Sequence, residues 1–489
     1  MGTRRNGFSK RESCVLSVDV GTTSIRCHVY DKVAKIRGSC TKKVSLLYPE
    51  PGRVEMDPEE LWQGFVSVVK GAVQSGLEMS QMEAIGISTQ RATFTTWDAV
   101  HGVMKMLHFL TRRKRFLAAS LVVFTPQHVS LRLLWALQNL PQLRQAVDEG
   151  TCLFGTIDTW LLYKLTKLVH ATDYSNASST AIFDSYQMCW SGFLCSLLSL
   201  PLSIFPKVQN THNFGSSDPS IFGVPIPIMS VMADQQAAMF GECCFHTGDV
   251  KITMGTGTFM DINTGNKPHT SVALYPLVGW KIGSEVVYLA EGNAAGTGTA
   301  IKWAQEILFS DVKDTVVMAN SVKDSDGVCF VPSFSGLQAP LNDPKACAAF
   351  MGLKPSTTKS HLVRAILESI AFNKQLFDVM LRETRIPITK IADGGVCTND
   401  FIMQLTTDLL GRKISRPAHF DMSCLGAAFV AGLGVYWKSK EELKKLQMTD
   451  RLFLPQCGKG DCCNGAVYKP VLQNWEEALQ RSMHWYSQS

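Results

Sequence analysis

The sequence lacks long hydrophobic runs, and this absence excludes a membrane-spanning helix. Its most apolar stretches, 116–124 and 193–205, are shorter than the roughly 20 residues that a bilayer requires. Charge of one sign is also scarce, because 48 basic and 42 acidic residues leave a net charge of +6. The basic tail 1–12 is therefore expected to be solvated rather than to bind nucleic acid. With no signal peptide recognised, we expect a cytoplasmic protein without a transmembrane segment or a nucleic acid partner.

Paired cysteine motifs are also missing, although the chain has 15 cysteines. Their odd number and irregular spacing fit reduced thiols better than a disulfide framework. Cys457, Cys462 and Cys463 lack the C-x-x-C spacing of a zinc site, so a loop is expected there. A low-complexity linker is absent too, and the chain is long enough for two domains. We expect these two domains to pack against each other.

Two short glycine-threonine loops carry most of the information that is present. The first is Asp19-Val20-Gly21-Thr22-Thr23-Ser24, and the second is Met254-Gly255-Thr256-Gly257-Thr258. Apolar residues alternate with a period of two around the first loop, which predicts a β-hairpin over 15–30. Glycine lets the backbone approach a ligand, and turn amides and threonine hydroxyls donate hydrogen bonds to phosphate. Two such loops in separate halves predict a duplicated domain that holds a polyphosphate from both sides.

Strands and helices alternate along the rest of the chain, which predicts α/β layers. We expect a short buried strand at 85–88 and a helix at 130–140 that ends before Pro141. The two halves are expected to meet at about 244–250. In the second half, the spacing of apolar residues predicts one long amphipathic helix at 360–382.

Three positions have residue types that suit phosphoryl transfer. Asp234 lies where an apolar strand is expected to lead into a helix, so it is either a helix cap or a general base. Asp19 is either a turn-stabilising residue or a ligand of Mg²⁺, which prefers oxygen ligands. The Gly394-Gly395 pair before Asn399 is either an ordinary turn or a place where adenine lies against bare backbone.

In this order, these motifs resemble those of the FGGY carbohydrate kinases, and they are particularly similar to the glycerol kinase branch. The resemblance covers nearly the whole chain. The segments that carry it are 19–26, 52–58, 172–178, 233–236, 253–257, 332–337, 367–371 and 393–404.

The resemblance implies an α/β fold with two ribonuclease-H-like domains of the actin and sugar-kinase superfamily and a nucleotide cleft between them. The N-terminal kinase domain, 13–245, would hold the substrate and the first phosphate loop. The C-terminal kinase domain, 246–450, would hold the nucleotide, and 451–489 would be an extension. The cofactors would be ATP and Mg²⁺.

Site residues also follow from the resemblance. Asp234 would be the catalytic base and a substrate ligand, and Arg91 and Gln235 would hold substrate hydroxyls. The metal ligand remains Asp19, which is predicted from its position beside the first loop. The nucleotide would be held by a larger set: Thr22, Thr23, Ser24, Arg26, Thr256, Gly298, Gly395 and Asn399.

The implied reaction is ATP-dependent phosphorylation of a small polyol, with glycerol to sn-glycerol 3-phosphate as the first candidate. Three departures keep other interpretations open. Ala92 stands where glycerol kinases have Glu, Gln127 stands at the position of their substrate Tyr, and the region 98–124 is shorter than in relatives. The alternatives are a kinase of a larger sugar or polyol, or a catalytically weak nucleotide-binding protein that regulates lipid metabolism through protein partners. A homo-oligomer is compatible with all of these.

Overall fold

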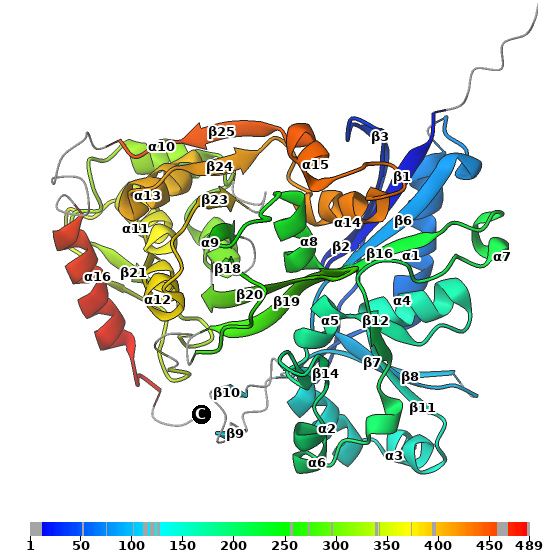
Figure 1. Cartoon of the computed structure of the whole chain (residues 1–489). Coiled ribbons are helices and arrows are strands. Elements are labelled where there is room, and N and C mark those ends of the chain that lie inside the picture. The colour runs from blue at the N-terminus through cyan, green and yellow to red at the C-terminus, as the bar shows by residue number, and fades with distance from the viewer. Residues whose placement is uncertain are drawn as a thin grey trace, which may run out of the picture. The chain divides into compact units, whose positions relative to one another are not determined.

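The computed structural model describes residues 12–486, except for short internal segments. The excepted residues are 51–52, 75, 101, 111–115, 118–122, 125–127, 255–257, 272–273, 295–296, 338–340, 342, 373, 394–397 and 457–467. The chain forms two compact units (Figure 1). The first comprises Met1–Cys243, Val278–Val286 and Ser423–Leu446, and the second comprises Cys244–Leu277, Val287–Met422 and Gln447–Ser489.

A mixed five-stranded sheet is the centre of the first unit. Its strand order is β16-β6-β1-β2-β3. Strands β1, β6 and β16 run parallel to one another, β2 is antiparallel to β1, and β3 is antiparallel to β2. The bounds are β1 Cys14–Val20, β2 Ser24–Tyr30, β3 Ile36–Lys43, β6 Met82–Thr89 and β16 Ile228–Ala233. The hairpin predicted over 15–30 is confirmed by the pairing of β1 with β2, and the strand predicted at 85–88 lies within β6.

A second sheet and several helices complete this unit. The sheet has the order β11-β7-β8-β5-β4, with β4 Leu47–Glu50, β5 Arg53–Met56, β7 Phe94–Asp98, β8 Gly102–Leu110 and β11 Cys152–Thr156. Two-stranded ladders join β9 Phe116–Leu117 to β10 Val123–Phe124, β12 Ala171–Asp173 to β15 Lys207–Gln209, and β13 Phe183–Asp184 to β14 Cys189–Trp190. The α-helices are α1 Pro58–Val73, α2 Val129–Asn139, α3 Pro141–Asp148, α4 Ile157–Thr166, α5 Tyr174–Ser178, α6 Gly192–Leu197, α7 Pro219–Phe222, α8 Asp234–Gly241, α14 Met422–Gly432, whose first residue is assigned to the second unit, and α15 Lys440–Leu446. Two 3₁₀ turns are η1 Met79–Gln81 and η2 Leu202–Ile204.

The second unit is built on a sheet with the order β19-β20-β18-β17-β23-β24-β25. Its strands are β17 Asp249–Met254, β18 Thr258–Gly265, β19 Tyr275–Ile282, β20 Glu285–Ala294, β23 Lys390–Asp393, β24 Ile414–Pro417 and β25 Thr449–Phe453, with a separate ladder of β21 Cys329–Val331 and β22 Ala349–Met351. The part of β19 from Val278 onward and the first two residues of β20 are assigned to the first unit. Its helices are α9 Thr297–Ile307, α10 Asp314–Asn320, α11 Lys359–Ala371, α12 Lys374–Thr384, α13 Asp400–Leu410 and α16 Lys469–Ser482. The prediction of one helix over 360–382 is wrong, because α11 ends at Ala371 and α12 begins at Lys374. The chain leaves α11 at Phe372, whose buried ring packs 5.4 Å from that of Trp475 on α16.

The two sheets repeat one strand pattern. In the second unit β17, β23 and β24 run parallel, and β18 and β20 continue the sheet antiparallel beyond β17. In the first unit β1, β6 and β16 take the parallel positions, and β2 and β3 take the antiparallel ones. Each glycine-threonine loop therefore joins the first two strands of a repeat. The duplicated architecture predicted from these loops is confirmed.

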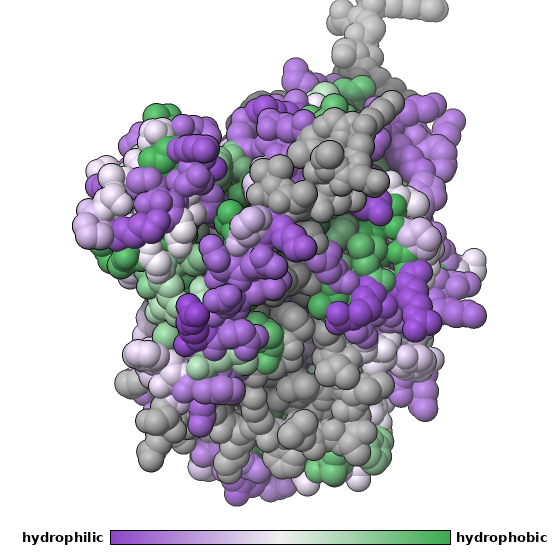
Figure 2. Space-filling model, turned by 90° about the vertical axis from the view of Figure 1, so that its left-hand side faces the viewer, coloured by the Kyte–Doolittle hydropathy of each residue, from purple (hydrophilic) through white to green (hydrophobic). Residues whose placement is uncertain are grey.

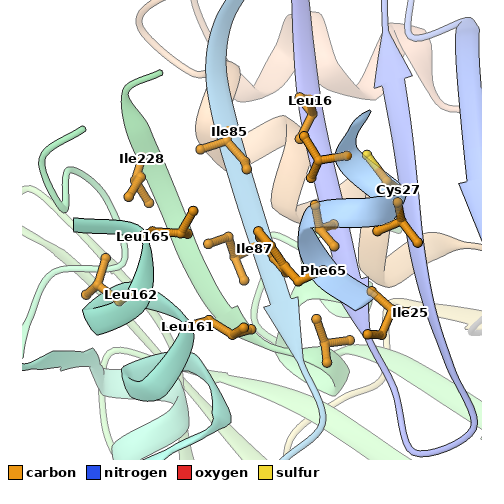
Figure 3. Packing of buried hydrophobic residues seen from close by; sticks show 14 of the residues in the cluster. Leu16, Ile25, Cys27, Phe65, Ile85, Ile87, Leu161, Leu162, Leu165 and Ile228 are labelled. Atoms are coloured by element: carbon orange, nitrogen blue, oxygen red, sulfur yellow. The ribbon is translucent and has the colours of Figure 1, made fainter. Parts of the chain in front are cut away.

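Apolar side chains between the first sheet and its covering helices form the main core of the first unit. Figure 3 shows Phe65 of α1 and Leu161, Leu162 and Leu165 of α4 directed at one face of the sheet. That face is made of alternate strand residues, as the period of two predicts. Those labelled in Figure 3 are Leu16, Ile25, Cys27, Ile85, Ile87 and Ile228.

A buried carboxylate lies at the start of α4. Asp158 accepts hydrogen bonds from the hydroxyls of Thr156 and Thr172, at 2.5 and 2.6 Å. Burial raises the pKa of Asp158 to about 7, although both hydroxyls act in the opposite direction. The folded protein therefore holds a proton on Asp158 in a pH range where the unfolded chain has lost it.

This raised pKa predicts that the protein loses stability as the pH rises. Below the ordinary pKa of an aspartate both states are protonated, and the stabilisation is lost as the pH rises through about 7. Between these values, Asp158 should contribute a slope of about 1.4 kcal/mol per pH unit to the free energy of unfolding. Urea unfolding from pH 5 to 7 should show that the stability of the wild type falls more steeply with pH than that of Asp158→Asn, by about this slope. An identical slope in both proteins would contradict the assignment.

The described surface carries both hydrophilic and hydrophobic residues. On the face shown in Figure 2, hydrophilic residues cover much of the coloured surface and hydrophobic residues form separate patches. Among the described residues, no helix is both long enough and apolar enough to cross a membrane.

Candidate active site

The carboxyl ends of three parallel strands form one edge of the sheet in the first unit. Val20 of β1 lies opposite Thr89 of β6, which lies opposite Ala233 of β16, so the chain leaves all three strands at the same level. Ligands of open α/β sheets bind outside this edge. Asp234 is the first residue of α8 and follows β16 directly, as the sequence predicts.

Asp19 lies one residue before the end of β1, in contact with the neighbouring strand. The hydroxyl of Ser88 donates a 2.6 Å hydrogen bond to its Oδ1, and Arg26 is its cross-strand partner on β2. The pKa of Asp19 is raised to about 6, mainly by burial and also by the negative charge of Asp234, while Ser88 and Arg26 act to lower it. Two carboxylates thus influence each other at the edge of the sheet. A divalent cation would relieve their repulsion.

Asp234 is paired with an arginine. Its Oδ1 lies 3.6 Å from Nε of Arg91 and accepts a 2.8 Å hydrogen bond from the backbone N–H of Gln235. The N-cap of α8 is Ala233, so Asp234 is a first-turn residue rather than the cap. Its carboxylate is 26% exposed and the arginine side chain is 12% exposed. The carboxylate is therefore held in place and can still be reached by a hydroxyl group.

The turn between β1 and β2 presents hydroxyl groups. The backbone N–H of Gly21 donates to the carbonyl of Ser24 at 2.9 Å and closes the turn. Thr23 at its tip is exposed, and Thr22 and Ser24 are half-buried. Gln90 was not predicted as a site residue. Its backbone N–H donates to the carbonyl of Val20 at 2.8 Å, and its Nε2 lies 3.4 Å from the carbonyl of Gly21.

The expected nucleotide residues of the second unit are partly described. Gly298 is the second residue of α9 and is half-buried. Asn399 caps α13: its Oδ1 accepts from the backbone N–H of Ile402 and its Nδ2 donates to the hydroxyl of Thr315, both at 3.1 Å. Thr256 and Gly395 lie outside the described residues, as does Gln127 of the first unit.

The turn after Arg91 is held by the buried side chain of Arg132, which was not predicted from the sequence. Ala92 has a φ of +62°, a left-handed conformation that alanine rarely adopts, and its carbonyl accepts a hydrogen bond from Arg132. Arg132 is buried with its guanidinium 5.6 Å from the ring centre of Phe94, and burial lowers its pKa to about 9. Arg132 thereby fixes the backbone next to Arg91.

Comparisons with known proteins match both halves of the chain to one family. Residues 14–241 match the N-terminal domain and residues 250–435 the C-terminal domain of the FGGY family of carbohydrate kinases. Glycerol kinase 5 of Danio rerio is 77% identical to this chain, with 100% of both chains covered. Glycerol kinase 2 of Thermotoga maritima is 37% identical and covers 96% of this chain and 99% of its own.

A solved structure shows the same fold. The crystal structure of Plasmodium falciparum glycerol kinase with ADP matches with a TM-score of 0.87 and 28% identity, over 96% of this chain and 98% of that one. The alignment with the Danio rerio relative extends over 528 positions against 489 residues here, so that relative contains residues without a counterpart in this chain. The two matched domains together span most of the chain, which therefore belongs to the FGGY family of carbohydrate kinases and is an ATP-dependent kinase of that family.

Proposed function

We propose that this protein transfers the γ-phosphoryl group of ATP to a hydroxyl group of a small polyol, with glycerol as the preferred acceptor. The observation that carries the proposal is the pairing of Asp234 with Arg91 at the carboxyl edge of the sheet, where the glycine-threonine turn also lies. The names of the glycerol kinase relatives support the choice of glycerol.

In this proposal Asp234 is the general base. Its carboxylate accepts the proton of the attacking hydroxyl, and Arg91 and Gln235 hold the other hydroxyls of the substrate. The base must be unprotonated before each turnover, and the ion pair with Arg91 holds its carboxylate in place. Positioning by these three residues supplies much of the rate, because phosphoryl transfer depends mainly on alignment and charge neutralisation.

ATP is assigned to both units. The hydroxyls of Thr22, Thr23 and Ser24, with Arg26, would contact the phosphates. The remaining assigned contacts belong to the second unit: Thr256, Gly298, Gly395 and Asn399.

Mg²⁺ is assigned to Asp19. A carboxylate whose pKa is raised by burial and by a second carboxylate is an oxygen donor that suits this ion. When bound, Mg²⁺ supplies charge neutralisation at the phosphate oxygens.

The test of substrate class is a panel of acceptors. Purified protein with Mg-ATP should release ADP faster with glycerol than with five-carbon polyols or ketoses of equal concentration. A higher kcat/KM for a five-carbon acceptor would contradict the choice of glycerol and favour the larger substrate, for which Ala92 in place of a glutamate leaves more room.

Substitution of Ala92 should change the affinity for glycerol. If the pocket binds glycerol, Ala92→Glu supplies a missing hydrogen-bond acceptor and should lower the KM for glycerol by roughly tenfold. Ala92→Met is the matched control, since both larger side chains meet the same left-handed backbone. Steady-state kinetics that show equal KM values for the two variants would argue against a glycerol-shaped pocket.

A further inference from the structure

Arg364 on α11 forms a partly buried ion pair in the second unit, in which the arginine side chain is 17% exposed. Its Nε donates a 2.8 Å hydrogen bond to Oε1 of Glu368, one helical turn away, and the glutamate side chain is 8% exposed. Burial raises the pKa of Glu368, whereas Arg364 and Ser325 lower it. The pair is largely shielded from solvent, which makes its geometry more constrained than that of a fully exposed ion pair.

The same guanidinium holds the end of a second helix. Its Nη1 donates to the carbonyls of Ala319 and Val322, at 3.0 and 2.7 Å. Ala319 lies in the last turn of α10 and Val322 follows it, so Arg364 satisfies carbonyls that a helix leaves without intrahelical partners. The guanidinium also lies 5.2 Å from the ring centre of Phe401 on α13. One side chain thus joins α10, α11 and α13.

The other end of α10 contacts the proposed nucleotide residue. Thr315, in the first turn of α10, is fully buried, and its hydroxyl accepts the 3.1 Å hydrogen bond from Nδ2 of Asn399. The Thr315 hydroxyl also donates to the carbonyl of Val312 at 2.6 Å, which fixes its orientation. Arg364 therefore holds one end of a two-turn helix whose other end holds the carboxamide of Asn399.

We propose that Arg364 is a positioning residue for the nucleotide, acting through α10 and Thr315 on Asn399. The inference rests on the proposed function, which assigns Asn399 to the nucleotide. Removing the guanidinium leaves the carbonyls of Ala319 and Val322 without these donors and the buried Glu368 without the positive charge of Arg364. α10 then shifts, Asn399 follows, and small displacements of a positioning group are costly for binding.

The test is nucleotide binding by Arg364→Ala in the full chain. We expect the Kd for ADP, measured by isothermal titration calorimetry at 10 °C, to rise at least tenfold. Arg364→Lys keeps the positive charge but loses the planar guanidinium with its several N–H donors, so it should give an intermediate Kd. Arg481→Ala is the matched control, because it removes an exposed arginine that is also paired four residues away, with Glu477. Its Kd should stay within twofold of the wild type.

Circular dichroism at 10 °C shows whether the variant is folded at the temperature of the binding measurement, and a thermal scan gives its unfolding temperature. A purely structural role for Arg364 would lower the unfolding temperature and leave the Kd of the folded protein unchanged, and that result would overturn the proposal. If Arg364→Ala does not fold, Glu368→Gln replaces it, with an expected two- to fivefold rise in Kd, and an unchanged Kd again overturns the proposal. ADP binding requires no phosphoryl transfer, so a protein that binds ADP but transfers nothing contradicts only the proposed function. A wild type that binds no ADP overturns both.

Discussion

Replacing Asp234 with asparagine should lower kcat by about a thousandfold while the Kd for ATP changes less than threefold. Loss of a general base typically costs two to four orders of magnitude. The substitution keeps the size of the side chain and its hydrogen bond from the backbone of Gln235, but removes the group that accepts the proton. Single-turnover kinetics and calorimetry on the same preparation would measure the two quantities separately.

Asp218→Asn is the matched control for this variant. Asp218 caps α7 in the same unit through the backbone N–H of Ser220, and asparagine caps helices equally well. Its kcat should therefore equal that of the wild type. Substantial phosphoryl transfer by Asp234→Asn would remove Asp234 as the base, and a matching loss in the control would point to a general loss of folded protein.

Adding one methyl group at Gly426 should destabilise the first unit by about 3 kcal/mol or more. A Cβ at this position would lie 1.7 Å from the carbonyl oxygen of Ala237 and 2.9 Å from the backbone nitrogen of Gly241. Both neighbours are backbone atoms of α8, so neither can move aside as a side chain would. The helices α8 and α14 must separate, and Asp234 is carried by the displaced helix.

Urea unfolding of Gly426→Ala, compared with Gly192→Ala, would measure this cost. A Cβ at Gly192 meets no described atom within 4 Å, so that control should differ from the wild type by less than about 0.5 kcal/mol. Equal stability of the two variants would contradict the close contact between α8 and α14.

Local patterns explain which parts of the fold could be predicted. Alternating apolar residues on both sides of Gly21 identify the β1–β2 hairpin, because such a pairing needs only neighbouring residues. The start of α8 at Asp234 is visible as the end of an apolar strand. The motifs also identified the FGGY family, which the domain matches confirm.

Contacts between distant residues explain most of what could not be predicted. Ser88 contacts Asp19 only because β6 pairs with β1 across 69 positions, and nothing around Ser88 indicates that register. The segment Ser423–Leu446 packs with the first unit although it follows most of the second in sequence. The pairing of Arg364 with Glu368 can be expected from their spacing of four residues on a helix, but the contacts of Arg364 with α10 cannot be predicted from the sequence.

ADP production from Mg-ATP, measured in the presence and absence of glycerol, distinguishes a polyol kinase from a nucleotide-binding protein. Glycerol should raise ADP production by at least tenfold, and sn-glycerol 3-phosphate should appear in equal amount. A protein that binds ATP but releases ADP at the same rate with and without any polyol would contradict the kinase assignment and favour a nucleotide-binding role.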